Sequence, residues 1–288
     1  MIEKFLNKAA GSLQPALYVV ATPIGNLADI TLRALAVLGR ADLVCAEDTR
    51  VTAQLLAAYG IQAKLMSVRE HNERQMADKV VAALSDGLIV AQVSDAGTPA
   101  VCDPGARLAA RVRGAGFNVV PVVGASAVMA ALSGAGVSES DFYFNGFLPP
   151  KSGERRKLFE RWSEADYPVV MFETPHRIGA ALADMAAVFP QRRLTLAREL
   201  TKTFETFLCG TVSDIQTALA DDGNQARGEM VLILHPAVRE KNAGLSEEAL
   251  RVMKILSAQL PTKQAAALAA EICGENKKSL YDAALAWK

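Results

Sequence analysis

Short apolar runs alternate with amphipathic stretches along the chain from Leu17 onward, and this alternation constrains the fold more than any other feature of the sequence. Stretches with helical spacing, such as TLRALAVLGR, lie between the runs. Repeated strand–helix units of this kind favour a mostly parallel sheet with helices on both faces. Right-handed crossovers then place the carboxyl end of every strand at one edge of that sheet. The runs of the first half lie at 17–21, 43–47, 64–68, 88–93 and 119–123.

A second α/β region and a helical end follow the first. Further apolar runs lie at 142–149, 168–173, 193–199, 206–212 and 229–235, with helices expected over about 153–163, 175–188 and 213–221. After Pro236 a polar segment, AVREKNAG, precedes three helical stretches that resemble a helix-turn-helix module. The sequence therefore predicts an α/β protein in four parts: a flexible N-terminal tail (1–15), an N-terminal α/β domain with a parallel sheet (16–136), a second α/β domain (137–238) and a C-terminal helical module (239–288).

The composition excludes several classes of protein. With 51% hydrophobic residues the chain is not disordered, and the 31 basic and 31 acidic residues cancel, so a nucleic-acid partner would have to bind a local basic patch. No run of about 18 apolar residues predicts a membrane span, and the N-terminus lacks the apolar core of a signal peptide. The four cysteines form no CxxC pair, which predicts reduced thiols in a cytoplasmic protein and no metal site.

Small and polar residues follow four strands of the first region, in TPIGN (22–26), EDTR (47–50), SDAGTP (94–99) and GASA (124–127). Ligands of open α/β sheets bind outside the carboxyl ends of the strands. Each loop alone could be only a tight turn, but a merely structural sheet would not need all of them to be short and polar. Neither GxGxxG after the first strand nor GxxxxGK[ST] is present, which argues against dinucleotide and P-loop sites. Asp103–Pro104 predicts a helix N-cap followed by the first helical residue.

Six ordered motifs carry a family resemblance: TPIGNLADITLRAL, AEDTR, SDAGTPAVCDPG, GFLPPKSGERRK, FETPHR and RELTKTFE. Together they resemble the ribosomal RNA small-subunit 2′-O-methyltransferases of the tetrapyrrole-methylase superfamily, over about 16–288. The resemblance implies a class III S-adenosylmethionine-dependent methyltransferase of two α/β domains, with the cofactor in the cleft between them and usually a homodimer. It also implies methylation of a cytidine ribose at its 2′-oxygen, in the decoding region of 16S ribosomal RNA of the small subunit.

The resemblance also implies a set of cofactor contacts, carried over by position. They come from three of the loops and from two places in the second domain: Pro23, Ser94, Asp95, Gly97, Thr98, Ser126, Ala127, Phe172 and the backbone near Gly228.

Methyl transfer to an alcohol needs alignment of the reactants and is helped by a base that accepts the hydroxyl proton. Carboxylates near the motifs are Glu47, Asp48, Glu173 and Glu199. We favour Glu47 and Asp48 of the EDTR loop as catalytic residues, with Arg50 orienting a carboxylate or contacting phosphate. The alternative is an Asp–Arg ion pair that only shapes the loop.

The densest basic cluster follows GFLPP and predicts contacts to RNA phosphates; it comprises Lys151, Arg155, Arg156 and Lys157. A solvated helix face is the alternative, because Glu154 and Glu160 interrupt it. Two other functions stay open. A small-molecule methylase on the same scaffold would need neither the cluster nor the terminal module, and a non-catalytic ribosome assembly factor would not need intact cofactor loops.

Overall fold

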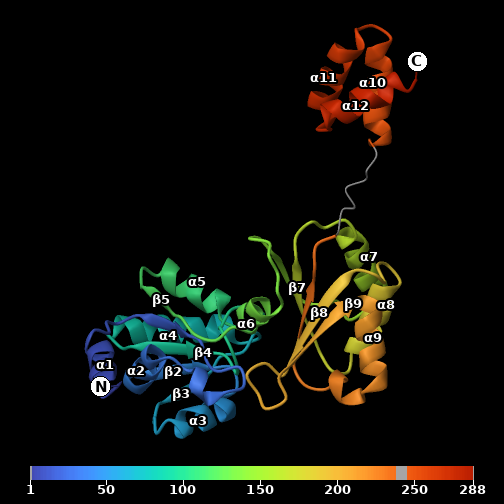
Figure 1. Cartoon of the computed structure of the whole chain (residues 1–288). Helices are drawn as coiled ribbons and strands as arrows, with labels where there is room; N and C mark the ends of the chain where they lie inside the picture. Colours follow the sequence, from blue (N-terminus) through green and yellow to red (C-terminus); the bar gives the residue numbers. More distant parts are fainter. Residues whose placement is uncertain (1, 238–244, 288) are drawn as a thin grey trace. The chain divides into compact units, whose positions relative to one another are not determined.

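The computed structural model describes residues 2–237 and 245–287, and the chain divides after Pro236 into two compact units. Figure 1 shows the larger unit with its two sheets and the smaller, all-helical unit. Within the described ranges no helix is long and apolar enough to cross a membrane.

The first sheet is parallel, with the strand order β3-β2-β4-β1-β5. Its strands are β1 (Leu17–Val20), β2 (Leu43–Ala46), β3 (Leu65–Ser67), β4 (Val90–Val93) and β5 (Val119–Val122). All lie inside the apolar runs, so the predicted parallel sheet is confirmed. The four strands whose loops carry the polar motifs, β2, β4, β1 and β5, are consecutive neighbours, and their loops therefore share one edge.

Helices cover both faces of this sheet because successive strand residues point to opposite sides. Val44 and Ala91 face α2 (Leu32–Arg40) and α3 (Thr49–Ala58) in one core cluster. Cys45 and Val90 face α4 (Glu73–Ser85) and α5 (Ala106–Gly114) in another. Strands that are buried on both faces have continuous apolar sequences, and this explains the apolar runs of the first half of the chain.

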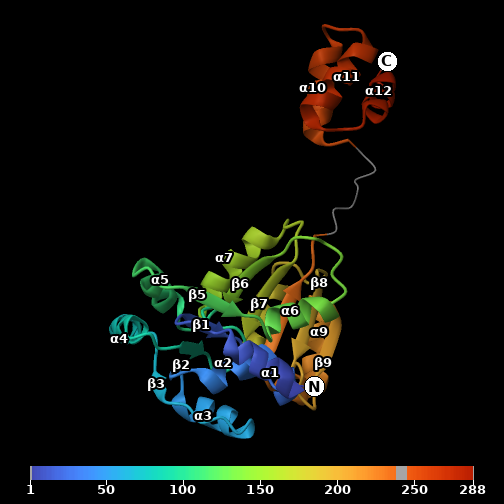
Figure 2. The same cartoon turned by 90° about the vertical axis from the view of Figure 1, so that its left-hand side faces the viewer.

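The predicted flexible tail contains a helix, α1 (Ile2–Gly11), which packs against α2 (Figure 2). None of its residues is fully buried, but Leu6 and Ala9 are half-buried. The apolar residues of this segment follow the three-to-four spacing of an amphipathic helix: Ile2, Phe5, Leu6 and Ala9. The prediction of a flexible tail missed this pattern.

The second sheet is mixed, with the order β6-β7-β10-β8-β9; β6 and β7 are parallel and the other pairs antiparallel. Its strands are β6 (Tyr143–Phe147), β7 (Val169–Glu173), β8 (Arg193–Arg198), β9 (Thr206–Thr211) and β10 (Met230–Leu234). The helices of this region are α7 (Ser152–Trp162), α8 (Ile178–Ala186) and α9 (Val212–Asp221).

The two faces of the second sheet have different partners. Met171 and Leu232 point into the cluster under α7, α8 and α9. Val170 and Val231, one residue along each strand, point to the opposite face and meet α6 (Ala127–Gly134). Figure 1 shows α6 on the side of this sheet away from α8 and α9. The last helix of the first α/β region thus packs on the second sheet and joins the two regions.

The smaller unit contains α10 (Glu247–Ser257), α11 (Thr262–Cys273) and α12 (Lys277–Leu285), as the helical module predicted. Its core is made largely of small side chains, among them Ala249, Ala265 and Ala269, around Met253 and Leu280. Most of the predicted polar linker lies outside the described residues. The short 3-10 helices η1 (Leu27–Asp29) and η2 (Gly223–Ala226) complete the elements. The exact bounds of the domains stay a prediction.

Candidate active site

Three loops at the carboxyl edge of the first sheet are tied together by hydrogen bonds. Thr22 N donates to Gly97 O at 2.9 Å, and Gly97 N donates to Thr22 O at 3.0 Å. Gly97 has a φ of +76°, which favours glycine. Thr98 Oγ1 donates to Ala125 O at 3.1 Å. The loop after β4 is therefore held between the loops after β1 and β5.

A cavity of about 470 Å³, here called cavity 1, opens beside these loops. Its wall combines residues of these loops with apolar side chains of the second sheet, among them Phe147, Phe172 and Val231. Among the predicted cofactor contacts, Asp95, Gly97, Thr98, Ser126, Ala127 and Phe172 line it. The other three predicted contacts lie beside lining residues: Pro23 precedes Ile24, the buried Ser94 precedes Asp95, and Gly228 precedes Glu229.

A second and larger cavity of about 800 Å³, here called cavity 2, adjoins the first. Its wall is polar and consists only of residues from the first α/β region: Glu47, Asp48, Arg50, Arg69, Glu70, His71, Glu73, Asp95 and Cys102–Arg107. Four residues line both cavities: Glu47, Asp95, Cys102 and Asp103. The two cavities thus meet at a wall that carries three carboxyl groups.

Two of the carboxyl groups at this shared wall, on Glu47 and Asp103, have raised pKa values. Burial raises the pKa of Glu47, and the negative charges of Asp103 and Asp95 raise it further. Burial also raises the pKa of Asp103, with Asp95 adding to the shift and a hydrogen bond from Ser94 opposing it. Asp95 Oδ1 accepts a hydrogen bond from Asp48 N at 3.0 Å. A carboxylate with a raised pKa is a stronger base, so Glu47 and Asp103 are suited to accept a proton.

Asp48 and Arg50 form an ion pair at the start of α3. Asp48 Oδ2 lies 2.6 Å from Arg50 Nη2, and Asp48 Oδ1 accepts from Arg50 N at 2.9 Å as the helix cap. The side-chain and backbone hydrogen bonds from Arg50 lower the pKa of Asp48. A carboxylate stabilised in its charged form is a weak base. Of the two predicted base candidates in this loop, the geometry favours Glu47.

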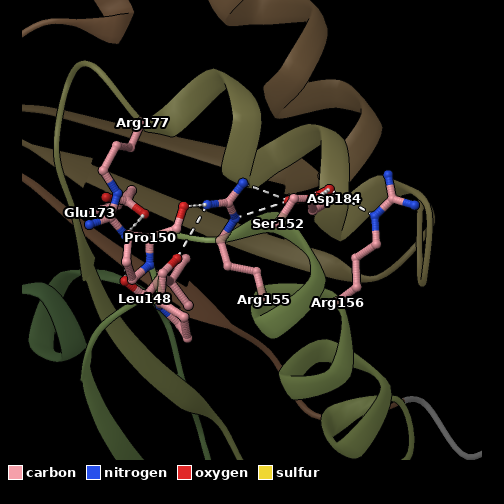
Figure 3. Close-up of polar contacts among 9 residues, drawn as sticks. Leu148, Pro150, Ser152, Arg155, Arg156, Glu173, Arg177 and Asp184 are labelled. Atoms are coloured by element: carbon pink, nitrogen blue, oxygen red, sulfur yellow. Dashed lines mark hydrogen bonds and ion pairs between the residues drawn. The ribbon is translucent and has the colours of Figure 1, made fainter.

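The other carboxylates considered as bases are held in ion pairs. Glu173 is buried, lines cavity 1 and lies 3.0 Å from Arg177 Nη2, which also donates to Leu148 O (Figure 3). Although burial opposes ionisation, hydrogen bonds from Lys202 and from Glu229 N lower the pKa of Glu199. Both groups shape the walls around cavity 1.

The structure corrects the prediction for one residue of the predicted RNA-binding cluster, Arg155. Arg155 is 4% exposed, and its Nη2 lies 2.7 Å from Asp184 Oδ2. Its Nη1 donates to Pro149 O at 3.2 Å and to Pro150 O at 2.8 Å, as Figure 3 shows for Pro150. The period of α7 puts Arg155 on the same face as Leu158, Phe159 and Trp162. The prediction of Arg155 as an RNA contact is therefore wrong: it is a buried structural side chain.

The rest of the cluster is exposed. Arg156 Nε donates to Asp184 Oδ1 at 2.8 Å while 55% of its side chain remains exposed. Lys151 pairs with Glu154 at 3.3 Å, and Lys157 is exposed. These three side chains are available to a partner, and their role as RNA contacts stays a prediction.

Sequence reasoning missed Asp103 because it assigned this residue to a helix start. The helix α5 begins at Ala106, and Gly105 is its N-cap. The buried Glu73 takes the capping role: its Oε1 accepts from Gly105 N at 3.0 Å and Leu108 N at 2.8 Å. Asp103 is therefore free to face both cavities. A Ser–Asp–x–Gly loop followed by a second aspartate was the only available signal.

Backbone strain marks the same region. Among the described residues, four that are not glycine have a positive φ: Ala100, Cys102, Glu199 and Thr201. Cys102 lines both cavities, and Leu200, between the last two, lines cavity 1. Such conformations cost about 1–3 kcal/mol each and gather at binding sites and active sites. In the part of the chain that the structure describes, no group of His, Cys, Asp and Glu side chains fits a metal ion.

Comparison with known proteins gives matches over the whole chain. Residues 16–216 match the family model of tetrapyrrole (corrin/porphyrin) methylases, and residues 243–288 match the RsmI C-terminal HTH domain. A Ribosomal RNA small subunit methyltransferase I of Neisseria meningitidis serogroup B is 76% identical, covering 100% of this chain and 99% of the relative. The protein of that name from Escherichia coli O157:H7 is 46% identical, covering 97% and 98%.

Solved structures share the fold of the larger unit. A cobalt precorrin-4 methyltransferase superimposes with a TM-score of 0.56 at 18% identity, covering 76% of this chain and 94% of that protein. A uroporphyrin-III-C-methyltransferase from Thermus thermophilus gives a TM-score of 0.53 at 22% identity, covering 76% and 93%. At these identities the likeness concerns the fold alone.

Proposed function

Because the chain belongs to the ribosomal RNA small subunit methyltransferase I family of tetrapyrrole methylases, we propose that it methylates the ribose 2′-oxygen of a cytidine in the decoding region of 16S ribosomal RNA. The methyl donor of the proposal is S-adenosylmethionine. The observation that carries the proposal is the pair of adjoining cavities, one for a donor and one for an acceptor, with Glu47, Asp95 and Asp103 at the wall between them.

Cavity 1 fits the donor by size and by lining. Its volume of about 470 Å³ is in the usual range of small-molecule sites, roughly 300–1,000 Å³. The small residues Ala96, Gly97 and Ala127 allow close approach to the backbone, and Phe172 and Val231 offer an apolar surface to a base. Asp95, Thr98 and Ser126 supply polar groups in the same wall. S-adenosylmethionine supplies a methyl group activated by a positive sulfur.

The protein's own part in the reaction is to hold the ribose hydroxyl and to accept its proton. The carboxylate of Glu47 is the proposed base, since it faces both cavities and has a raised pKa. Asp103 stands beside it as a second acceptor that can hydrogen-bond the hydroxyl. A positioned base contributes roughly 10²–10⁴ in rate. Alignment of the hydroxyl by the shared wall contributes separately.

The test is transfer of radiolabelled methyl groups from S-adenosylmethionine to purified small ribosomal subunits, to free 16S RNA and to a uroporphyrinogen. We expect label in the RNA of the subunits, at a ribose 2′-oxygen located by nuclease digestion and mass spectrometry. Label in the tetrapyrrole alone would support the small-molecule methylase instead. Binding to subunits without transfer would support a non-catalytic assembly factor.

The proposal includes the setting of the reaction. A protein that acts on ribosomal RNA works where ribosomes are assembled, which in bacteria is the cytoplasm. We propose a homodimer, the usual state of the superfamily, as the active form. Sedimentation equilibrium at micromolar protein gives the mass, and a monomer that retains full transfer would contradict this part.

A further inference from the structure

Cavity 2 has one arginine in each of the three loops that build it. Arg50 follows β2, Arg69 follows β3, and Arg107 is in the first turn of α5 after the β4 loop. All three side chains are exposed. None of them lines cavity 1. The positive charges of the site are thus gathered in cavity 2, which has no lining residue from the second sheet.

These arginines differ in the partners they already have. Arg50 is paired with Asp48. Arg69 donates from Nε to the backbone oxygen of Glu47 at 3.3 Å, and its charge acts on the carboxyl groups of Glu47 and Asp48 without forming an ion pair with either. Among the residues that the structure describes, neither Arg69 nor Arg107 takes part in an ion pair. An exposed arginine that lines a cavity and forms no ion pair can donate several hydrogen bonds to an anion.

The acidic residues of cavity 2 do not cancel this charge evenly. Glu73 is buried and occupied as the cap of α5, and Asp48 is neutralised by Arg50. Glu70 is exposed and also lines cavity 2, next to Arg69 in the sequence. The other three carboxyl groups, on Glu47, Asp95 and Asp103, lie at the wall shared with cavity 1. The cavity therefore has acceptors for hydroxyl groups on the reaction side and cationic donors away from it.

We propose that cavity 2 is the subsite for the target nucleotide, in which Arg69 and Arg107 bind backbone phosphates that flank the reacting ribose. The inference rests on the proposed function and extends it to residues outside the sequence motifs. A ribonucleotide segment carries both features of the cavity in the same order: a ribose hydroxyl to meet the carboxylates, and anionic phosphates a few bonds away for the arginines. Arginine guanidinium groups bind phosphate with two parallel hydrogen bonds. Phosphate contacts position an RNA strand without reading its sequence.

The experiment uses the full chain with the substitutions Arg69→Gln and Arg107→Gln, separately and together. Arg113→Gln is the matched control, because Arg113 is an exposed residue near the end of the same helix α5 and lines neither cavity. Arg50 is left intact, since its side chain already pairs with Asp48, and its removal would also leave that carboxylate without its ion-pair partner. We measure KM and kcat for methylation of small subunits, RNA affinity at several salt concentrations, and S-adenosylmethionine affinity by calorimetry.

Each single variant should raise KM for the small subunits by about tenfold, the loss for one charge-assisted contact of about 1.4 kcal/mol, with a smaller change in kcat. Each should lower the slope of log affinity against log salt by about 0.7, the value for one phosphate of a single strand. The double variant should raise KM for the small subunits by about a hundredfold. The affinity for S-adenosylmethionine should not change in any of the variants. The Arg113→Gln control should match the wild type in every measurement.

Three results overturn the inference, and they are distinguishable. If the wild type methylates small subunits and both variants keep its KM and salt slope, the arginines do not contact the RNA, while the proposed function stands. If the wild type labels only the tetrapyrrole, the proposed function fails and the inference fails with it. A drop in RNA affinity accompanied by an equal drop in donor affinity would also contradict a phosphate-binding role, because it would indicate a distorted site.

Discussion

Two charged segments look alike in the sequence, EDTR at 47–50 and GERRK at 153–157, but they lie in opposite environments. In the first, 83% of the Arg50 side chain is exposed, and the loop lines an open cavity. In the second, 5% of the Arg155 side chain is exposed, and its guanidinium is bound by Asp184 and two proline carbonyls. The difference teaches that a charged motif near a site can be there either for a ligand or for the fold.

Glu47 of the first segment and Asp184, the partner of the second, respond to pH with opposite signs. Although burial opposes ionisation of Asp184, hydrogen bonds from Arg156, Ser152 and Arg155 lower its pKa. Its contribution to stability is present above the unfolded pKa and is lost as the pH falls through the folded value. The pKa of Glu47 is raised, so its ionisation costs stability as the pH rises through that value. A carboxyl group with a raised pKa is typical of a reaction site, whereas a carboxylate stabilised by hydrogen bonds is typical of a structural ion pair.

The largest effect should come from the site. Replacing Glu47 by Gln keeps its shape but removes the base, and should lower the rate of methyl transfer by roughly 10²–10⁴ with little change in thermal stability. Single-turnover transfer to small subunits measures this rate. Glu160→Gln, an exposed change on α7, is the matched control and should keep the wild-type rate. A Glu47→Gln protein with full activity would place the base elsewhere, with Asp103 the next residue to change.

The buried pair should give the largest effect on stability. Asp184→Ala leaves the charge of Arg155 buried without its partner, and should lower the free energy of unfolding by about 3–5 kcal/mol. Urea denaturation followed by circular dichroism measures it. Asp78→Ala breaks an exposed pair with Arg111 and should cost less than about 1 kcal/mol.

Should Asp184→Ala not fold, Ser152→Ala removes one hydrogen bond of the same cluster, 2.7 Å long, at a cost of about 1 kcal/mol. Equal stabilities of the Asp184 and Asp78 variants would remove the distinction between the two regions.

A smaller effect is expected from the exposed part of the second segment. Lys157→Gln should leave stability unchanged and, if this face contacts RNA, lower the salt slope of RNA binding by about 0.7. Filter binding at four salt concentrations is sufficient. Lys79→Gln, an exposed change on α4, is the control. An unchanged slope would mean that the face of α7 is only solvated.

The smallest effect sharpens the assignment of Glu47. Protonated Glu47 cannot accept the hydroxyl proton, so the rate should fall as the pH falls through its raised pKa. Arg69 opposes that shift through its positive charge. Arg69→Gln should therefore move the acidic limb of the kcat profile to higher pH, while Arg107→Gln should leave it in place. Coincident profiles for the wild type and Arg69→Gln would argue against Glu47 as the titrating group.

The sequence predicted the strands well and the charged side chains poorly, for a physical reason. An apolar run such as LIVAQV is buried wherever it folds, so β4 follows from local chemistry. The fate of Arg155 depends on Asp184, 29 residues away, and no local pattern separates it from Arg156. The role of Asp103 likewise depends on a residue distant in the sequence, because Glu73 of α4 supplies the cap of α5. The gathering of the four polar loops was predictable because the fold brings the carboxyl ends of parallel strands to one edge.

The origin of the lining residues has a consequence for how such a protein changes over time. Cavity 1 is lined by residues of both α/β regions, whereas cavity 2 is lined only by three strand-to-helix segments of the first region. Under the proposed roles of the two cavities, insertions or substitutions at 69–73 and 104–107 would alter the acceptor while leaving the donor site unchanged. On that proposal the donor site and the acceptor site of one scaffold can evolve separately.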